Sequence, residues 1–354
     1  MVVKTKSNRN VKRFWARAFA GFALAAAGMA SGAWEHGGAR RGISSADDRG
    51  AGFRFVAYWD GANIPGGRFE RPIGIAVAPS GDVYITDSRK RVLHLNRRGR
   101  FLGGWGREGR GPGDFEIPMG IAVAPDRSVY VSDYELDRVQ KFTADGRFLL
   151  AFGKSGSGPG EFDAPAGLAV DAAGYVCVAD FYNDRTEKFN SVDAFQKVIG
   201  KPGRLGEGAL HYPTGVSILP GGGLLVADAY NYELQWFTAS GQPRGRRGYH
   251  LFWLWPRPTS SDGGFNTPTG VAAGSNGGIY VADGGNHRVV MLSPDRKFMA
   301  AWKIPNAASG VDSPEQVAAS PDGTTVYATD LAANRIIVLK VVDRAGLAST
   351  RGKN

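Results

Sequence analysis

Residues 268–292 read PTGVAAGSNGGIYVADGGNHRVVML, and this stretch decides the fold of the chain. A Pro and a Gly open a short apolar strand, a Gly-rich turn follows, and a second strand ends on Asp283. A short loop then leads to a third strand, RVVML. Gly and Asn in the turn and the loop tolerate backbone angles that other residues avoid. The same pattern occurs six times between residue 72 and the C-terminal region.

Two markers give the period of this repeat. A Pro two residues before a Gly occurs at Pro72, Pro118, Pro165, Pro213 and Pro268, and Pro314 opens the sixth copy alone. The Asp that ends the second strand recurs in steps of 46, 47, 48, 55 and 47 residues, at Asp87, Asp133, Asp180, Asp228, Asp283 and Asp330. A period of roughly 20–50 residues with several short strands in each unit indicates a propeller or a solenoid.

The second copy shows how many strands each unit holds. Strand-like runs occur at residues 120–125 (GIAVAP), 128–133 (SVYVSD), 138–142 (RVQKF) and 147–153 (RFLLAFG). Pro-Asp and Asp-Gly turns separate them, and helical periodicity is almost absent. Four antiparallel strands in each of six units predict an all-β fold, a six-bladed β-propeller of four-stranded blades over residues 53–343.

The segment at residues 53–61, FRFVAYWDG, precedes the first full copy and matches the fourth strands of other copies. The sixth copy ends after its third strand, RIIVLKVV, near Asp343. We therefore expect the N-terminal strand to complete the last blade from outside and to close the ring. Such closure also covers a sheet edge that would otherwise stay open.

These residues resemble the NHL-repeat family of six-bladed propellers. The runs VYVSD, VCVAD, LLVAD and IYVAD each end on the marker Asp, and Asn183, Asn231 and Asn286 follow that Asp by three residues. An Arg follows it by five residues at Arg138, Arg185, Arg288 and Arg335. The resemblance is imperfect in the first copy, whose loop is one residue shorter, and in the fourth, where Glu233 replaces the Arg.

The N-terminal region differs from the repeats. Residues 1–33 combine six basic residues with an apolar run that ends in small residues, which is typical of a secretory signal peptide. The alternative is a membrane anchor over residues 14–34, although the apolar run is shorter than the roughly 20 residues that span a bilayer. We expect an exported protein with a disordered leader at residues 34–52 and a tail at residues 344–354.

Charge makes nucleic-acid binding a weak candidate, and a single cysteine cannot form an internal disulfide. The chain carries a formal charge of +10, and without the six basic residues of the N-terminal region about +4 remains for the propeller. A modestly basic exported domain is a poor candidate for nucleic-acid binding. The single cysteine, Cys177, lies inside the apolar run VCVAD and is expected to be a buried small hydrophobic residue.

The repeated Asp and Arg residues are predicted to be structural, because a catalytic site needs one constellation and not six copies of it. An Asp at the end of one strand and an Arg at the start of the next can pair across the loop or reach the adjacent blade. Function is therefore expected where the repeat is broken.

Metal and catalytic sets are sparse. Zinc histidines of the similar amidating lyases lie at the blade entries, which here hold no histidine but Ile73, Met119, Ala166, Thr214, Thr269 and Glu315. The similar lactonases hold a central calcium through acidic and amide side chains, and here only Glu315, beside Gln316, resembles such a ligand. Calcium takes six to eight oxygen ligands. We expect no cofactor, and Glu315 is only a weak candidate for a calcium site.

The remaining candidate is a binding surface around the channel mouth, formed by the loops between second and third strands and by the linkers between blades. Aromatic and Arg side chains are enriched at interfaces. The predicted ligand- or partner-binding residues are Tyr134, Phe181, Tyr182, Tyr230, Tyr232, Arg89, Arg91 and Arg107, with Lys90 and Arg110 beside them. Thr214, Thr269, Glu315 and Gln316 are predicted at the channel mouth. The alternative is that the tyrosines only pack the loops.

The fourth copy also carries an aromatic insertion, residues 248–258 (GYHLFWLWPRP), which predicts either a partner surface or a tucked loop. Taken together, the sequence predicts an exported, non-enzymatic propeller that recognises a protein, a peptide or a glycan at its channel-mouth face. The alternatives are a metal-dependent lyase or hydrolase with its site in the channel, and an RNA-binding module like that of the cytoplasmic tripartite-motif NHL proteins.

Overall fold

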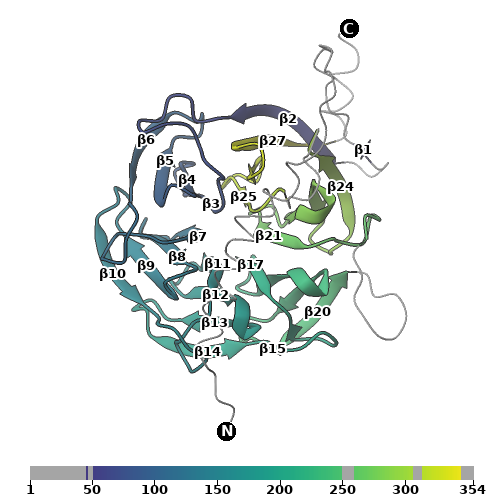
Figure 1. Ribbon diagram of the computed structural model, residues 1–354. Coiled ribbons are helices and arrows are strands. Elements are labelled where there is room, and N and C mark those ends of the chain that lie inside the picture. The colour runs from purple at the N-terminus through teal and green to yellow at the C-terminus, as the bar shows by residue number, and fades with distance from the viewer. Residues whose placement is uncertain (1–44, 47–50, 249–258, 306–312, 344–354) are drawn as a thin grey trace, which may run out of the picture.

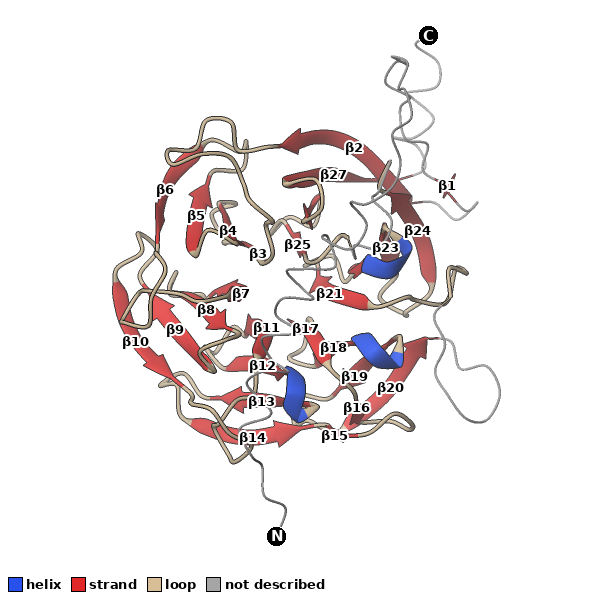
Figure 2. Cartoon of the chain, in the orientation of Figure 1, coloured by secondary structure: helices blue, strands red, loops and turns tan. Residues whose placement is uncertain are grey.

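Six antiparallel sheets, five of four strands and one with an added short fifth strand, surround a central axis in the computed structural model, which describes residues 45–46, 51–248, 259–305 and 313–343 (Figure 1). The predicted six-bladed, all-β propeller is therefore confirmed. Figure 2 shows strands almost throughout, with three short 3₁₀ turns as the helical elements of the described residues. These are η1 (Phe181–Asn183), η2 (Ala229–Asn231) and η3 (Gly284–Asn286).

Each blade uses four strands, counted from the axis outward. Blade 1 holds β3 (Ile75–Val77), β4 (Val83–Asp87), β5 (Arg91–Leu95) and β6 (Phe101–Trp105). Blade 2 holds β7 (Pro118–Val123), β8 (Val129–Asp133), β9 (Arg138–Phe142) and β10 (Phe148–Phe152). Blade 3 holds β11 (Pro165–Val170), β12 (Val176–Asp180), β13 (Arg185–Phe189) and β14 (Phe195–Ile199).

The second half of the ring repeats this order. Blade 4 holds β17 (Pro213–Ile218), β18 (Leu224–Asp228), β19 (Glu233–Phe237) and β20 (Pro243–Gly248), and the linker before it contains the parallel pair β15 (Lys201–Pro202) and β16 (Ala209–Leu210). Blade 5 holds β21 (Pro268–Ala273), β22 (Ile279–Asp283), β23 (Arg288–Leu292) and β24 (Phe298–Lys303). Blade 6 holds β25 (Val317–Ala319), β26 (Thr325–Asp330) and β27 (Arg335–Asp343), with β2 (Ala51–Trp59) outside them.

Burial changes from the second strand to the fourth. All five residues of β8 are buried, because neighbouring blades cover both of its faces. The fourth strand β10 instead alternates between half-buried and exposed residues, since one of its faces meets solvent. This difference explains why apolar runs mark second strands in the sequence and alternating runs mark fourth strands.

The N-terminal strand closes the ring, as the sequence predicted. β2 pairs antiparallel with β27, from Ala51 opposite Asp343 to Trp59 opposite Ile336. Within the leader expected to be disordered, β1 (Ser45–Ala46) forms a short antiparallel pair with β24 of blade 5. The first and last parts of the propeller are therefore joined by backbone hydrogen bonds, and β27 has no open edge along this stretch.

Close backbone contact joins the inner strands of neighbouring blades. A Cβ added to Gly120 would lie 2.4 Å from the carbonyl oxygen of Ala166 in the next blade. The Ser132 hydroxyl donates to that same oxygen at 2.6 Å. The marker glycines are thus needed for the approach of two backbones, and not for a turn.

The repeated Asp and Arg form a contact that we call the blade clamp: the buried Asp that ends a second strand, together with the Arg that opens the third. In blade 5, Arg288 Nε lies 2.7 Å from Asp283 Oδ2. Arg288 also donates to the carbonyl oxygens of Ser260, Ser261 and Gly264 in the preceding linker. The Asp283 carboxylate in turn accepts the backbone N–H of Asn266. The structural role predicted for these residues is confirmed.

Two blades depart from this arrangement. Arg138 in blade 2 keeps the hydrogen bonds to the linker carbonyls, those of Arg110, Gly111 and Asp114, but its buried Nε has no hydrogen-bond partner among the described residues. In blade 4, where Glu233 replaces the Arg, the carboxylate of Asp228 instead accepts hydrogen bonds from Asn231 and Gln235. Burial raises the pKa of Asp228 well above its usual range. In blade 4, amide side chains therefore donate the hydrogen bonds to the buried Asp that the Arg donates in other blades.

The prediction for Cys177 is confirmed, whereas other predictions lie outside the described residues. Cys177 is buried and free, and burial raises the pKa of its thiol to about 12. No helix in the described part of the chain is both long and apolar enough to cross a bilayer. The predicted signal peptide and nearly all of the aromatic insertion at residues 248–258 lie outside the described residues.

Candidate functional site

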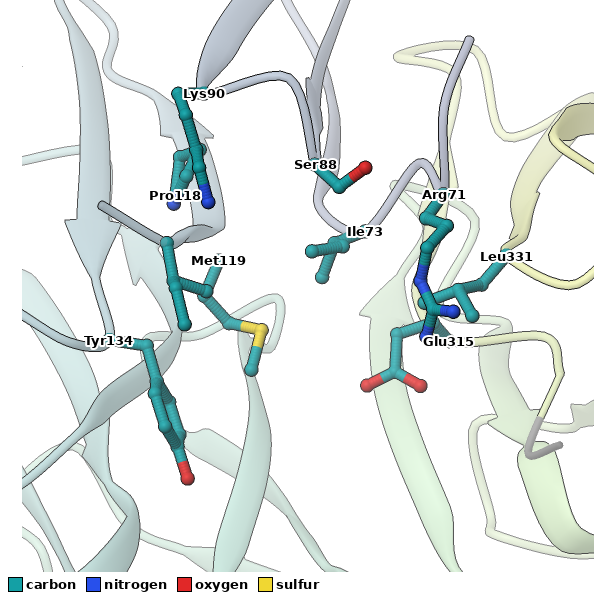
Figure 3. A pocket seen from close by; sticks show the side chains of 10 residues that line it. Arg71, Ile73, Ser88, Lys90, Pro118, Met119, Tyr134, Glu315 and Leu331 are labelled. Atoms are coloured by element: carbon teal, nitrogen blue, oxygen red, sulfur yellow. The ribbon is translucent and has the colours of Figure 1, made fainter. Parts of the chain in front are cut away.

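A pocket of about 100 Å³ opens at the channel mouth where blades 1, 2 and 6 meet (Figure 3). We call it the mouth pocket. The blade entries and the loops between second and third strands supply its lining: Arg71, Ile73, Ser88, Lys90, Ile117, Pro118, Met119, Tyr134, Glu315 and Leu331. Because the same two segments of each blade meet here, the pocket is a direct consequence of the repeat geometry. Its chemistry comes from the side chains that differ between blades.

The mouth pocket has apolar and charged sides. Figure 3 shows Met119 and Tyr134 on one side, and Arg71 and Glu315 together on the other. Burial lowers the pKa of Arg71, while the negative charges of Glu315 and Glu70 oppose that shift. The guanidinium of Arg71 and the carboxylate of Glu315 therefore balance each other on one side of the pocket.

The backbone around Arg71 is held by the preceding blade of the ring. Its N–H donates to Oδ1 of Asn334 at 2.7 Å, and its φ angle of 46° lies in the left-handed region. A left-handed non-glycine residue is uncommon and needs support from its surroundings. The contact with Asn334 supplies that support and positions the Arg71 side chain at the pocket.

An aromatic ridge extends from the mouth pocket over blades 3 and 4. It comprises Tyr134, Phe181, Tyr182, Tyr212 and Tyr230. The ring centroids of Tyr134 and Phe181 lie 6.0 Å apart, and Phe181 stacks on Tyr212 at 4.8 Å. Tilted and stacked ring contacts at such distances stabilise aromatic clusters beyond simple burial. The ridge therefore presents a rigid surface that continues one wall of the pocket.

The predicted aromatic residues differ in exposure. Tyr134 and Phe181 are buried, at 1% and 3% exposure, so their rings mainly pack the loops. Tyr182, Tyr230 and Tyr232 are half-buried and keep part of their surface at the channel mouth. The packing interpretation therefore holds for Tyr134 and Phe181. For the half-buried outer tyrosines, the binding surface stays a prediction.

The predicted cations are held by neighbouring acids. Arg89 lies 2.8 Å from Glu70, and Arg107 lies 2.8 Å from Asp114. Arg91 belongs to the blade clamp of blade 1, at 2.9 Å from Asp87. Arg91 is therefore structural in this position, whereas Arg89 and Arg107 stay exposed on the surface of blade 1.

The four predicted channel-mouth residues separate into two groups. The hydroxyls of Thr214 and Thr269 donate to the carbonyl oxygens of Pro268 and Pro314 in the next blades, at 3.3 and 3.0 Å. Gln316 Nε2 donates to the Thr269 carbonyl oxygen at 3.1 Å. These three side chains join neighbouring blades, and Glu315 alone of the four lines the mouth pocket.

A histidine that the sequence did not single out lies beside the ridge. His211 Nδ1 is 3.3 Å from Asp184 Oδ1, and its Nε2 is 2.6 Å from an Arg204 nitrogen. Its ring stacks on Tyr212 at 4.2 Å. His211 and Tyr212 directly precede the entry proline Pro213, and this position next to a blade entry is the signal that could have revealed them.

No group of three or more His, Cys, Asp or Glu side chains suited to a metal ion occurs in the part of the chain that the structure describes. The prediction of a weak calcium site at Glu315 thus stays untested. The single carboxylate at the mouth pocket supplies at most two of the six to eight oxygens that calcium takes.

Comparisons with known proteins agree with the fold and leave the activity open. The chain resembles a streptogramin B lyase structure at 14% identity (83% of this chain, 98% of that chain, TM-score 0.56). It resembles a gluconolactonase from Xanthomonas campestris at 14% identity (86% and 99%, TM-score 0.57). A chain of the nidogen/laminin complex is similar at 19% identity (70% and 86%, TM-score 0.52). Enzymes and a binding protein thus share this fold.

No protein of curated function matches this chain in sequence. The NHL repeat model matches residues 210–237 and 265–291, which cover the end of the linker into blade 4, its first three strands, and the corresponding part of blade 5. The other blades have the same strand order and the same buried Asp at the end of the second strand. The chain is therefore a six-bladed β-propeller that contains NHL repeats, matched in blades 4 and 5.

Proposed function

We propose that this protein is an exported, non-enzymatic binding propeller that takes a peptide segment of a partner at its channel-mouth face. The observation that carries the proposal is the mouth pocket, with its apolar wall and its position at the end of the aromatic ridge. Small-molecule sites usually enclose about 300–1,000 Å³. A pocket of about 100 Å³ suits one side chain of a partner better than a whole substrate.

The residue types around the pocket support recognition. Tyrosine, methionine and arginine are enriched at the centres of protein interfaces, and pockets that accept one anchor side chain often contribute most of the affinity. The loops that carry Tyr182 and Tyr230 are short and rest on buried rings, so little conformational entropy is lost when a partner binds. Short loops on a rigid scaffold are a common location for binding sites.

A random heptapeptide library displayed on phage tests this proposal. We expect the wild-type protein to enrich peptides, and we expect Met119→Trp, which fills the pocket, and the pair Tyr182→Ala with Tyr230→Ala to reduce their binding by at least about tenfold. Val192→Ser is the matched control, because Val192 is 76% exposed in a turn at the opposite end of blade 3. Equal binding by all four proteins would overturn the proposal.

The second candidate is a metal-dependent lyase or hydrolase, which the position of Glu315 in the mouth pocket favours. Elemental analysis of the purified protein separates the two. Calcium or zinc bound in stoichiometric amounts, and lost on Glu315→Gln, would support the enzyme and count against a purely binding role.

A further inference from the structure

One repeated position holds a lysine in blade 1. The residue before each third strand has a positive φ angle, between 52° and 62°, at Lys90, Asp137, Asp184, Tyr232, His287 and Asn334. In three blades its side-chain oxygen accepts the backbone N–H of the residue before the next blade's entry proline. Asp137 accepts from Ala164, Asp184 from Tyr212 and Asn334 from Arg71, at 2.7–2.8 Å. This contact joins consecutive blades.

Lys90 cannot make this contact, because an ammonium group has no acceptor. The corresponding N–H, that of Ile117, donates instead to Asp133 of its own blade at 3.1 Å. The Lys90 side chain lines the mouth pocket, and its ammonium has no ion-pair or hydrogen-bond partner among residues 51–248, 259–305 and 313–343. Its neighbours Arg89 and Arg91 are both paired with acids.

Among the residues that line the mouth pocket, one positive charge therefore has no matching negative charge. Arg71 and Glu315 balance each other on one side, and the positive charge of Lys90 remains. Beside Lys90 lie the apolar side chains of Ile117, Pro118 and Met119. An ammonium next to an apolar cavity favours a ligand that brings a carboxylate and an aliphatic group together.

We propose that Lys90 binds a carboxylate of the partner peptide while the adjacent aliphatic side chain fills the mouth pocket. The inference rests on the proposed function and names the ligand class of the same site. A cavity of roughly 150 Å³ holds benzene, so about 100 Å³ holds an aliphatic group of about four carbons, such as that of leucine or valine. The carboxylate comes from an Asp or Glu side chain or from a chain terminus.

Isovalerate and its neutral amide, isovaleramide, are the simplest probes. The chain has five methionines, and Met119 lies in the pocket, so methyl-labelled methionine gives an NMR spectrum in which Met119→Leu assigns the reporting signal. We expect isovalerate to shift the Met119 signal with an affinity about tenfold higher than that of isovaleramide, because a charge-assisted hydrogen bond contributes to one and not to the other.

Variants test whether Lys90 causes the preference. In Lys90→Met and Lys90→Asn we expect the acid and the amide to bind alike, and Asn tolerates the left-handed backbone and restores an acceptor. Lys297→Met, an exposed lysine on the opposite face, is expected to keep the preference. Equal binding of both probes to the wild type, no shift with either probe, or a preference retained without Lys90 would overturn the inference.

Two acetylated peptides distinguish the source of the carboxylate: Gly-Gly-Leu with a free C-terminus, and Leu-Asp-Gly with an amidated C-terminus. Tighter binding of the first assigns a chain terminus, and tighter binding of the second assigns an acidic side chain. Library peptides that depend on Met119 but carry no carboxylate would refute the role of Lys90 and leave the proposed function standing.

Discussion

Single residues in this propeller show how burial sets its response to pH. Glu187 on β13 is fully buried, and its carboxylate lies 2.9 Å from Arg185 Nη2. Burial raises the pKa of Glu187 to about 7, and the positive charge of Arg185 only partly opposes that shift. The folded state therefore holds this proton more tightly than the unfolded chain does, in which the pKa is about 4.5. The stability that the protonated group contributes is present below about pH 4.5 and is lost as the pH rises through 7.

Replacing Glu187 with Gln should change how the free energy of unfolding depends on pH. The amide keeps the shape of the side chain but does not ionise, so the free energy of unfolding should fall less between about pH 5 and pH 8 than in the wild type. We expect the difference to be on the order of 1 kcal/mol, measured by urea unfolding at both pH values. The exposed Glu108→Gln serves as the control and should behave as the wild type does. Identical pH profiles for Glu187→Gln and the wild type would show that Glu187 does not titrate in this range.

At the scale of elements, the blade clamp of blade 5 links the second strand to the linker before its own blade. Arg288 makes one ion pair and three hydrogen bonds to carbonyl oxygens and is only 4% exposed. Removing one partner of a buried pair leaves the other charge uncompensated, which usually costs about 3–5 kcal/mol. Because each clamp joins a blade to the chain that enters it, the loss of one clamp should weaken the ring as a whole.

We therefore expect Arg288→Met to lower the free energy of unfolding by about 3 kcal/mol near neutral pH. The loss should be smaller at about pH 5, because burial already raises the pKa of Asp283 to about 6 and its carboxyl can then be protonated. Arg107→Met removes an exposed ion pair and should cost less than about 1 kcal/mol. Urea unfolding of both variants measures the difference, and equal costs would contradict a structural role for the clamp.

Most elements could be predicted from the sequence because their signals are local. The spacing of Asp87 and its five counterparts predicted six blades, and the likeness of residues 53–61 to other fourth strands predicted the closure by β2. The amide contacts that replace the missing Arg in blade 4 were not predicted. They depend on Gln235, which donates to Asp228 seven residues away on the neighbouring strand. The spacing of the repeats does not predict this contact.

The candidate site could be predicted only in part for the same reason. The sequence indicated loops that line the mouth pocket, but it did not show that Tyr134 and Phe181 are buried beneath Tyr182 and Tyr230. The mouth pocket combines residues that lie more than 200 positions apart in the chain, such as Arg71 and Glu315. These distant residues come together because the ring closes and because their side chains are long enough to reach the pocket. A single repeat encodes neither property.

At the scale of the whole molecule, the propeller offers two different faces. The channel-mouth face carries the loops between second and third strands, with the mouth pocket and the aromatic ridge. The opposite face carries the tight turns between third and fourth strands, which internal hydrogen bonds such as Gly99 N–H to the Asn96 carbonyl hold closed. We expect partners to bind the first face and not the second.

Hydrogen exchange of the propeller, alone and with the tightest peptide from the library selection, tests this claim most directly. We expect slower exchange of backbone amides in residues 88–90, 117–119, 134–137 and 181–184, which surround the mouth pocket and the ridge. Slower exchange confined to the turns at residues 96–99, 143–146 and 190–193 would place the binding surface on the opposite face and would contradict it.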